Sequence, residues 1–290
     1  LNFNVANIEF QKILNYGIHI TSTADITAYY DIAGGWNMDL YSLKGKNALG
    51  NEFYCPFQTK WNWKRASDIQ ASSQIDIVSA DDNNEIYIVV TGKTSLRANC
   101  NVTNATFPVV SPIVNNAGDT IKITLNRGQT YAIRNWDKTL AGALGGTHIW
   151  TKDKTKKIAV TITDDSAQSS CGGCADIIGD QLVPLHILGK QYIVMSSKLS
   201  AACDGWFFVG ITKNNTSITI NYQGDSVRTY GPFNTSIVPS QAVRAFKVPA
   251  GKFVYVETTE PVIILHVAGF GCEVGGAILP PTANCTGSTE

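Results

Sequence analysis

The sequence predicts an all-β protein made of tandem antiparallel β-sandwich units, of jelly-roll or Ig-like type, that arise from an internal repeat. The first observation is periodicity. Apolar and β-branched residues alternate with polar ones in steps of two, as in half-buried strands. This pattern occurs in residues 74–78, 85–90, 120–125, 157–163, 217–222 and 253–258. Asn, Asp, Gly and Pro separate these segments at hairpin spacing, and no long segment has the period of an amphipathic helix.

The second observation is a pattern that occurs nearly three times. The first copy holds GIHITSTADITAYY and DLYSLKGKNALGNEFY, and the second holds THIWTKDKTKKIAVTI and DQLVPLHILGKQYIV. The third copy holds FVYVETTEPVIILHV and CEVGGAILPP. In register, residues 78–88 match residues 209–219, and both read as a strand, an Asn-Asn turn and a strand. Recurring units of this kind are the sign of a repeat architecture.

The repeat and the chain length together predict two domains. At 290 residues the chain is long enough for two cores of ordinary size. We expect a first sandwich unit in residues 1–148, with residues 1–17 as the tail of a preceding unit. The second unit then covers residues 149–290 and includes the start of a third copy from about residue 254. Copies that begin and stop within the pattern suggest a segment of a longer protein, or termini that complete each other's sheet.

The composition argues against two classes of partner. Lys and Arg number 23, as do Asp and Glu, so no net field attracts nucleic acid. No apolar window is long enough to insert into a membrane. Charged residues make up 16% of the chain, against roughly 25% in an average soluble domain. A surface that is polar through hydroxyls and amides suits an exported β protein.

Seven cysteines favour an oxidising compartment and structural disulfides. We expect Cys272 to pair with Cys285, Cys55 with Cys100, and Cys203 with Cys171 or Cys174. The odd count leaves one thiol free, intermolecular or paired outside the chain. The Cys171-Gly-Gly-Cys174 motif lacks a second CxxC or a paired histidine for zinc, and the glycine and proline that follow it break the helix a redox motif needs.

No pattern predicts an enzyme, a metal or a cofactor. The four histidines lack metal-ligand spacing, and no nucleophile motif is present. Asp81, Asp82 and Glu85 could supply oxygens to Ca²⁺, but the matching turn at residues 213–216 contains no acid. Turn chemistry explains these acids better.

Three tryptophans are candidates for ligand binding because they do not recur in the second copy. In an extended strand, Trp61 and Trp63 would point to one face, beside Lys60 and Arg65. Together with Trp36, such indoles could contact sugar CH surfaces or a peptide. The alternative is that the tryptophans close one end of a sandwich core.

Several dispersed motifs carry a family resemblance. They are the DxLVPLxxLGxxY pattern, the Asn-Asn hairpin after it, the segment TTEPVIILHVAG and the ending GFGCEVGGAILPPTANCTGS. These motifs resemble the IgGFc-binding protein N-terminal domain family, and the ending is close to its bacterial surface-protein branch. The first pattern comprises Asp180, Leu182, Val183, Pro184, Leu185, Leu188, Gly189 and Tyr192.

The resemblance implies a secreted or cell-surface, non-enzymatic module for binding or adhesion. Its expected partner is a glycan, a glycoprotein or another protein ligand. One alternative is a structural spacer or filament subunit, in which edge strands pair neighbouring chains. A hydrolase on a β scaffold is the third alternative.

Overall fold

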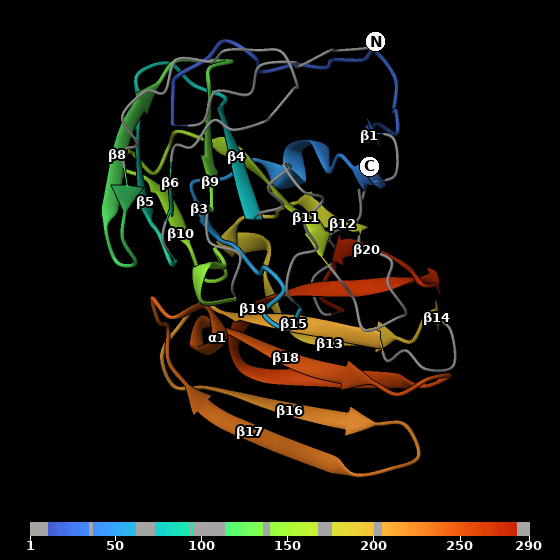
Figure 1. Cartoon of the computed structure of the whole chain (residues 1–290). Helices are drawn as coiled ribbons and strands as arrows, with labels where there is room; N and C mark the ends of the chain where they lie inside the picture. The colour runs from blue at the N-terminus through green and yellow to red at the C-terminus, as the bar shows by residue number, and fades with distance from the viewer. Residues whose placement is uncertain are drawn as a thin grey trace, which may run out of the picture.

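The protein is mostly β, as predicted, with several antiparallel sheets (Figure 1). The structure is a computed structural model that describes residues 11–34, 37–61, 73–92, 94–95, 114–135, 140–167, 176–199 and 205–282. The strands are β1 (Tyr29–Gly34), β2 (Asn37–Ser42), β3 (Glu52–Tyr54), β4 (Ser73–Ser79), β5 (Asn84–Val89), β6 (Thr94–Ser95), β7 (Val114–Asn115), β8 (Thr120–Leu125), β9 (Thr130–Arg134), β10 (His148–Thr151), β11 (Ile158–Ala167), β12 (Asp176–Gln181), β13 (Gly189–Met195), β14 (Lys198–Leu199), β15 (Gly205–Ile211), β16 (Thr216–Tyr222), β17 (Val227–Phe233), β18 (Val243–Val248), β19 (Phe253–Gly271) and β20 (Glu273–Ile278). The helical turns are η1 (Gly45–Ala48), η2 (Leu140–Gly142), η3 (Leu185–Ile187) and α1 (Pro239–Ala242).

Two four-stranded sheets make up the first half of the molecule. Their strand orders are β3-β10-β5-β8 and β12-β11-β4-β9. Buried and partly exposed residues alternate strictly along β4 and β5, so one face of each strand turns inward. The isoleucines at alternate positions of both strands are fully or almost fully buried in a shared core. These strand orders differ from the A-B-E-D and C-F-G sheets of an immunoglobulin domain.

The second half is a curled eight-stranded sheet organised by the long strand β19 (Figure 1). The first part of β19 pairs with β13 and β16, and its second part pairs with β15 and β20. With β17 and β18 added at the edges, the two parts give the orders β13-β19-β16-β17 and β20-β19-β15-β18. These are the strand orders of the first half, with β19 in the place of both β10 and β11.

Matching contacts occur at the start of each half. Gly50 forms an isolated bridge with Ile158, and Gly189 pairs with Val262. A Cβ atom on Gly50 would lie 2.2 Å from Pro184, and one on Gly189 would lie 2.3 Å from Pro281. Only glycine allows the chain to pass so close to a proline ring.

The two Asn-Asn turns correct the sequence register by one residue. Asn83 and Asn215 hold the left-handed conformation, with φ of 50° and 60°. The sequence alignment of residues 78–88 with 209–219 had placed Asn83 opposite Asn214. The backbone N–H of Asn83 donates a hydrogen bond to the side-chain oxygen of Asn126, and the backbone N–H of Asn215 donates one to the side-chain oxygen of Asn234.

The strand pairings group β3–β5 and β8–β12 in the first half and β13–β20 in the second, and the predicted boundary lies between residues 148 and 149. That boundary falls within β10, which pairs with β3 and β5 of the first half. β11 pairs with β4 of the first half and with β12. The expected start of a third copy at residue 254 falls within β19, which is an integral strand of the second half.

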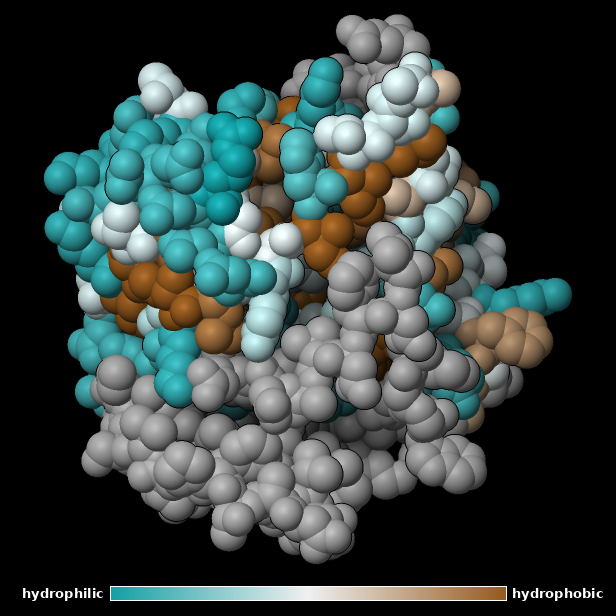
Figure 2. All heavy atoms as spheres, turned by 90° about the horizontal axis from the view of Figure 1, so that it is seen from above, coloured by the Kyte–Doolittle hydropathy of each residue, from teal (hydrophilic) through white to brown (hydrophobic). Residues whose placement is uncertain are grey.

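The hydrophobic core joins the halves. One cluster contains Phe57 and Trp61 of the first half together with Trp206, Phe208 and Ile263 of the second. Every residue of β15 is buried, because one of its faces packs into this shared cluster and the other into a second cluster within the curled sheet. Seen from above, hydrophobic side chains gather in separate patches between hydrophilic regions of the described surface (Figure 2).

Candidate functional site

Of the predicted tryptophan site, the structure describes Trp61 and Lys60. Trp61 is 7% exposed and packs edge-on against Trp206 and Phe208, with ring centroids 6.4 and 5.7 Å away. Lys60 is exposed, and its Nζ lies 4.2 Å from the ring centroid of Trp206. Trp61 therefore packs between the halves, which is the alternative role stated for the tryptophans. Trp36, Trp63 and Arg65 lie outside the described residues.

A different group of aromatic rings lies on the outer face of the sheet β3-β10-β5-β8. Tyr54 stacks on His148 with centroids 4.3 Å apart, His148 stacks on Trp150 at 4.6 Å, and Trp150 stacks on Tyr87 at 5.5 Å. The interplanar angles are 10°, 29° and 10°. We call these four residues the aromatic ladder. All four side chains are partly exposed.

The sheet geometry fixes how the ladder meets the solvent. Side chains stand roughly perpendicular to a sheet, and neighbouring strands lie about 4.8 Å apart. Near-parallel rings at this spacing cover one another's faces, so the ring edges and polar tips point outward. The face of Tyr87 is also shared with Lys122, whose Nζ lies 5.7 Å from the ring centroid. The ladder is thus held rigid by contacts among its own members.

Charged side chains border the ladder. Glu85 lies 3.2 Å from Lys122 and 3.1 Å from Lys152, and it accepts a hydrogen bond of 2.6 Å from the Tyr87 hydroxyl. On the other side, Glu52 lies 3.0 Å from His148 Nε2 and 3.5 Å from Lys154. The three lysine side chains are 54–65% exposed, whereas the two glutamates are 23% and 27% exposed. The ammonium groups are therefore the outermost charges.

The protonation states follow from these contacts. Burial lowers the pKa of His148 below its usual value, against the opposing effect of Glu52, so the ring is neutral at pH 7. Burial, with a smaller contribution from the Glu52 charge, raises the pKa of Tyr54 to about 12. The hydrogen bonds from Tyr87 and Lys152 lower the pKa of Glu85 to about 2. The ladder thus presents phenol hydroxyls and an imidazole next to the carboxyl and ammonium groups of its border.

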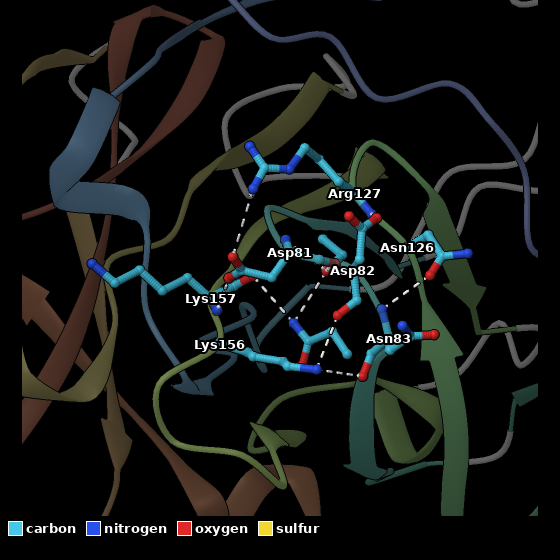
Figure 3. Close-up of polar contacts among 9 residues, drawn as sticks. Asp81, Asp82, Asn83, Asn126, Arg127, Lys156 and Lys157 are labelled. Atoms are coloured by element: carbon cyan, nitrogen blue, oxygen red, sulfur yellow. Dashed lines mark hydrogen bonds and ion pairs between the residues drawn. The ribbon is translucent and has the colours of Figure 1, made fainter.

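The acidic cluster of the first Asn-Asn turn takes part in holding three loops together (Figure 3). Asp81 accepts a hydrogen bond from the backbone N–H of Lys157 at 2.7 Å, and Asp82 accepts one from the backbone N–H of Arg127 at 3.0 Å. Lys156 Nζ donates to the carbonyl oxygens of Asp82 and Asn83. These contacts join the β4–β5, β8–β9 and β10–β11 connections, in agreement with the prediction of turn chemistry. Glu85 belongs to the ladder border instead.

The described cysteines correct one disulfide prediction. Cys55 is a free, fully buried thiol whose pKa is raised by burial, contrary to the predicted pairing with Cys100. Cys272 is disulfide-bonded, and its predicted partner Cys285 lies outside the described residues. Cys100, Cys171, Cys174 and Cys203 also lie outside them, so the remaining pairings stay predictions.

Within the described part of the chain, no group of three or more His, Cys, Asp or Glu side chains is placed to hold a metal ion. None of its helices is long and apolar enough to cross a membrane.

The sequence holds a signal for the ladder that is separate from the three candidate tryptophans. In β5, Glu85 and Tyr87 alternate with buried isoleucines, and in β10 His148 and Trp150 flank the buried Ile149. A strand that puts isoleucine inward and aromatic rings outward predicts an aromatic outer face. That these rings would stack depended on strand order, which the alternation alone does not give.

Comparison with known proteins identifies the family. Searches of curated proteins and of solved structures returned no match to this chain. The family described as IgGFc binding protein matches residues 41–285, a range that includes both halves of the fold and the whole ladder. The chain therefore belongs to the IgGFc-binding protein family.

Proposed function

We propose that this chain is a secreted or cell-surface, non-enzymatic module for binding or adhesion, and that its ligand contacts the aromatic ladder. Membership of a family named for binding supports the general class. We further propose that it belongs to the bacterial surface-protein branch, which the ending GFGCEVGGAILPPTANCTGS resembles. Rigid tyrosine and tryptophan side chains supply contact area at little entropic cost, which is why they are frequent at binding surfaces.

The observation that carries the proposal comes from comparing corresponding positions in the two halves. Strand pairing places Ile193, Tyr255, Glu257 and Thr219 where the first half has Tyr54, His148, Trp150 and Tyr87. None of the four ladder residues recurs.

The inward positions of the same strands behave differently. Phe53 corresponds to Tyr192 and Ile149 to Val256, and all four are buried and apolar or aromatic. We interpret the halves as an internal repeat that keeps the core and varies the outer face. Because the second half folds without a ladder, the fold does not require one, and the ladder is free to serve a ligand.

A second candidate function is assembly with neighbouring subunits. On the corresponding face of the second half, Met195 pairs with Phe253 and Ile193 pairs with Tyr255, and the first three of these side chains are 65%, 41% and 50% exposed. Exposed apolar groups in register favour a contact with another chain. This face, rather than the ladder, would be the contact in a spacer or filament.

The binding proposal is tested with immobilised mucin glycoprotein. The variant Tyr87→Ala/Trp150→Ala should bind at least about tenfold more weakly than the wild type, because it removes the centre of the ladder. Tyr255→Ala, on the matching face of the second half, is the control and should bind normally. Circular dichroism checks the fold, and light scattering reports assembly. Wild-type affinity in the folded double variant would contradict the proposal.

A further inference from the structure

We propose that the ligand of the aromatic ladder is an anionic glycan, a saccharide chain that carries sulfate or carboxylate groups. This inference rests on the proposed function and adds the chemical class of the ligand. It follows from which groups of the ladder and its border reach the solvent first.

The outermost groups are cations and hydrogen-bond donors. The ammonium groups of Lys122, Lys152 and Lys154 project furthest, and the partly buried Glu52 and Glu85 hold them in place. Among the paired groups of the border, three lysines face two glutamates. Lysines that are already positioned by ion pairs lose less entropy when an anion arrives.

The orientation of the rings points the same way. An aromatic ring carries partial negative charge on its faces and partial positive charge at its edge. Neutral sugars bind by laying CH groups on a ring face, but the facing surfaces within the ladder are covered by neighbouring rings. The exposed edges, with the Tyr54 hydroxyl, instead attract acceptor atoms such as sulfate and carboxylate oxygens.

The shape of the site favours an extended saccharide chain as the ligand over the surface of a folded protein. The ladder crosses β3, β10 and β5 as a single row, and β8 carries Lys122 beside the last ring. Lys152 follows β10, and its ion pair with Glu85 places it near the same end of the row. An elongated row bordered by cations matches an extended polyanion.

The charges are as specific to the first half as the rings are. Strand pairing places Thr229 at the position that corresponds to Lys122, and Gln191 at the position that corresponds to Glu52. Ser217 takes the place of Glu85, directly before Ile218 as Glu85 precedes Ile86. The second half therefore lacks the charged border, although its sheet has the same strand order.

The test measures binding of the full chain to immobilised chondroitin sulfate, to desulfated chondroitin and to neutral dextran. We expect chondroitin sulfate to bind, dextran not to bind, and affinity to fall with added salt because screening weakens exposed charges. Loss of binding on desulfation would assign sulfate as the recognised group, and retained binding would assign the uronate carboxylate. The variant Lys122→Gln/Lys152→Gln should bind at least about tenfold more weakly.

The matched control is Lys213→Gln. Lys213 is 55% exposed and lies 3.2 Å from Glu260, so it resembles the border lysines in exposure and pairing but belongs to the second half. Its variant should bind as the wild type does. A wild type that binds none of the charged polymers, or that binds dextran equally well, would overturn the proposal.

Failure of this inference and failure of the proposed function give different results. Mucin binding that is lost in Tyr87→Ala/Trp150→Ala but kept in Lys122→Gln/Lys152→Gln would leave the binding site intact and refute the anionic ligand. Ladder-dependent binding to polyglutamate without any binding to charged glycans would refute it as well, in favour of an acidic protein. Mucin binding that survives in both folded variants would refute the site itself.

Discussion

Trp61 and Trp150 show how two residues of the same type acquire different roles. Trp61 contacts Trp206 and Phe208 across the junction of the halves and is shielded from water. Trp150 lies on an outer sheet face between His148 and Tyr87. The two indoles differ in how far other residues cover them. Replacing Trp61 should therefore mainly lower the stability of the fold, and replacing Trp150 should mainly weaken ligand binding.

Replacing Trp61 with alanine should lower the free energy of unfolding by about 3–5 kcal/mol, because it leaves a cavity in the shared core. Trp150→Ala should cost only about 1–2 kcal/mol, the value of its stacking contacts. Urea unfolding followed by circular dichroism measures both. Equal losses in the two variants would contradict the different burial assigned to them.

At the residue scale, the sequence identified aromatic residues as candidates for binding or for core packing, and Trp61 packs in the core. The absence of a counterpart in the second copy singled out Trp61, and the same criterion applies to Tyr87, His148 and Trp150. Burial separates them, and burial of Trp61 depends on residues of β15 that come much later in the chain. Local sequence holds no information on that contact.

At the scale of elements, period-two alternation predicted most strands of the described core correctly. The sequence alignment of the two Asn-Asn turns was one residue off, because asparagine is accepted at either position of such a turn. Only the backbone conformation shows which of the two asparagines has a positive φ. The meeting of β12 with β20 was not predictable from either strand. Here a Cβ atom on Gly276 would lie 2.8 Å from the backbone nitrogen of Gly179, so the two strands touch directly.

Carboxylates close the free edge of β20 along this contact. The backbone N–H of Val274 donates to Asp176 at 2.9 Å, and that of Ile278 donates to Asp180 at 2.8 Å. Two N–H groups of the strand are thus satisfied by side chains, which hinders the edge from pairing with another chain. Of these carboxylates, Asp180 forms an ion pair with Lys44, whose Nζ lies 2.6 Å from Asp180 Oδ1.

The contact between β12 and β20, which we call the seam, should be more stable in mild acid. Burial raises the pKa of Asp39 and of Asp176 to about 6, and for Asp176 the nearby Glu273 adds to the effect. Carboxyls whose folded pKa is raised bind more protons in the folded state, so their contribution to stability is lost as pH rises from about 4 through 6. His148 and His266, whose pKa values are lowered, give the opposite slope, so a variant must be compared with the wild type.

Asp176→Asn keeps an acceptor for the N–H of Val274 and removes the charge. Relative to the wild type, its unfolding free energy should rise by on the order of 1 kcal/mol between pH 4.5 and pH 7.5. Chemical unfolding at a series of pH values measures this difference. Asp225→Asn, at an exposed carboxylate of the β16–β17 turn, is the control and should show no such trend. A pH-independent difference for Asp176→Asn would contradict the role of the seam.

At the scale of the whole molecule, the sequence predicted an all-β fold, and the structure is mostly β. The predicted boundary between residues 148 and 149 falls within β10, and the motif that occurs as GKNALGNEFY and LGKQYIV stands at β3 and β13, the first strands of the sheets in the two halves. A repeat has a period but no marked starting point, so spacing alone does not say where one folded unit closes. Strand pairing supplies that information, and it also shows that the halves share a core.

The shared core predicts that the two halves unfold together. The cluster that contains Phe57 and Trp61 also contains Trp206, Phe208 and Ile263, and β15 is buried on both faces. Separating the halves would expose these apolar side chains, so neither half should remain folded alone. Differential scanning calorimetry should therefore show one transition, with equal calorimetric and van't Hoff enthalpies. Phe208→Ala should move that whole transition to lower temperature, because Phe208 belongs to the core that both halves use. Two transitions, of which Phe208→Ala shifts only one, would mean that each half is stabilised separately and that the junction contributes little.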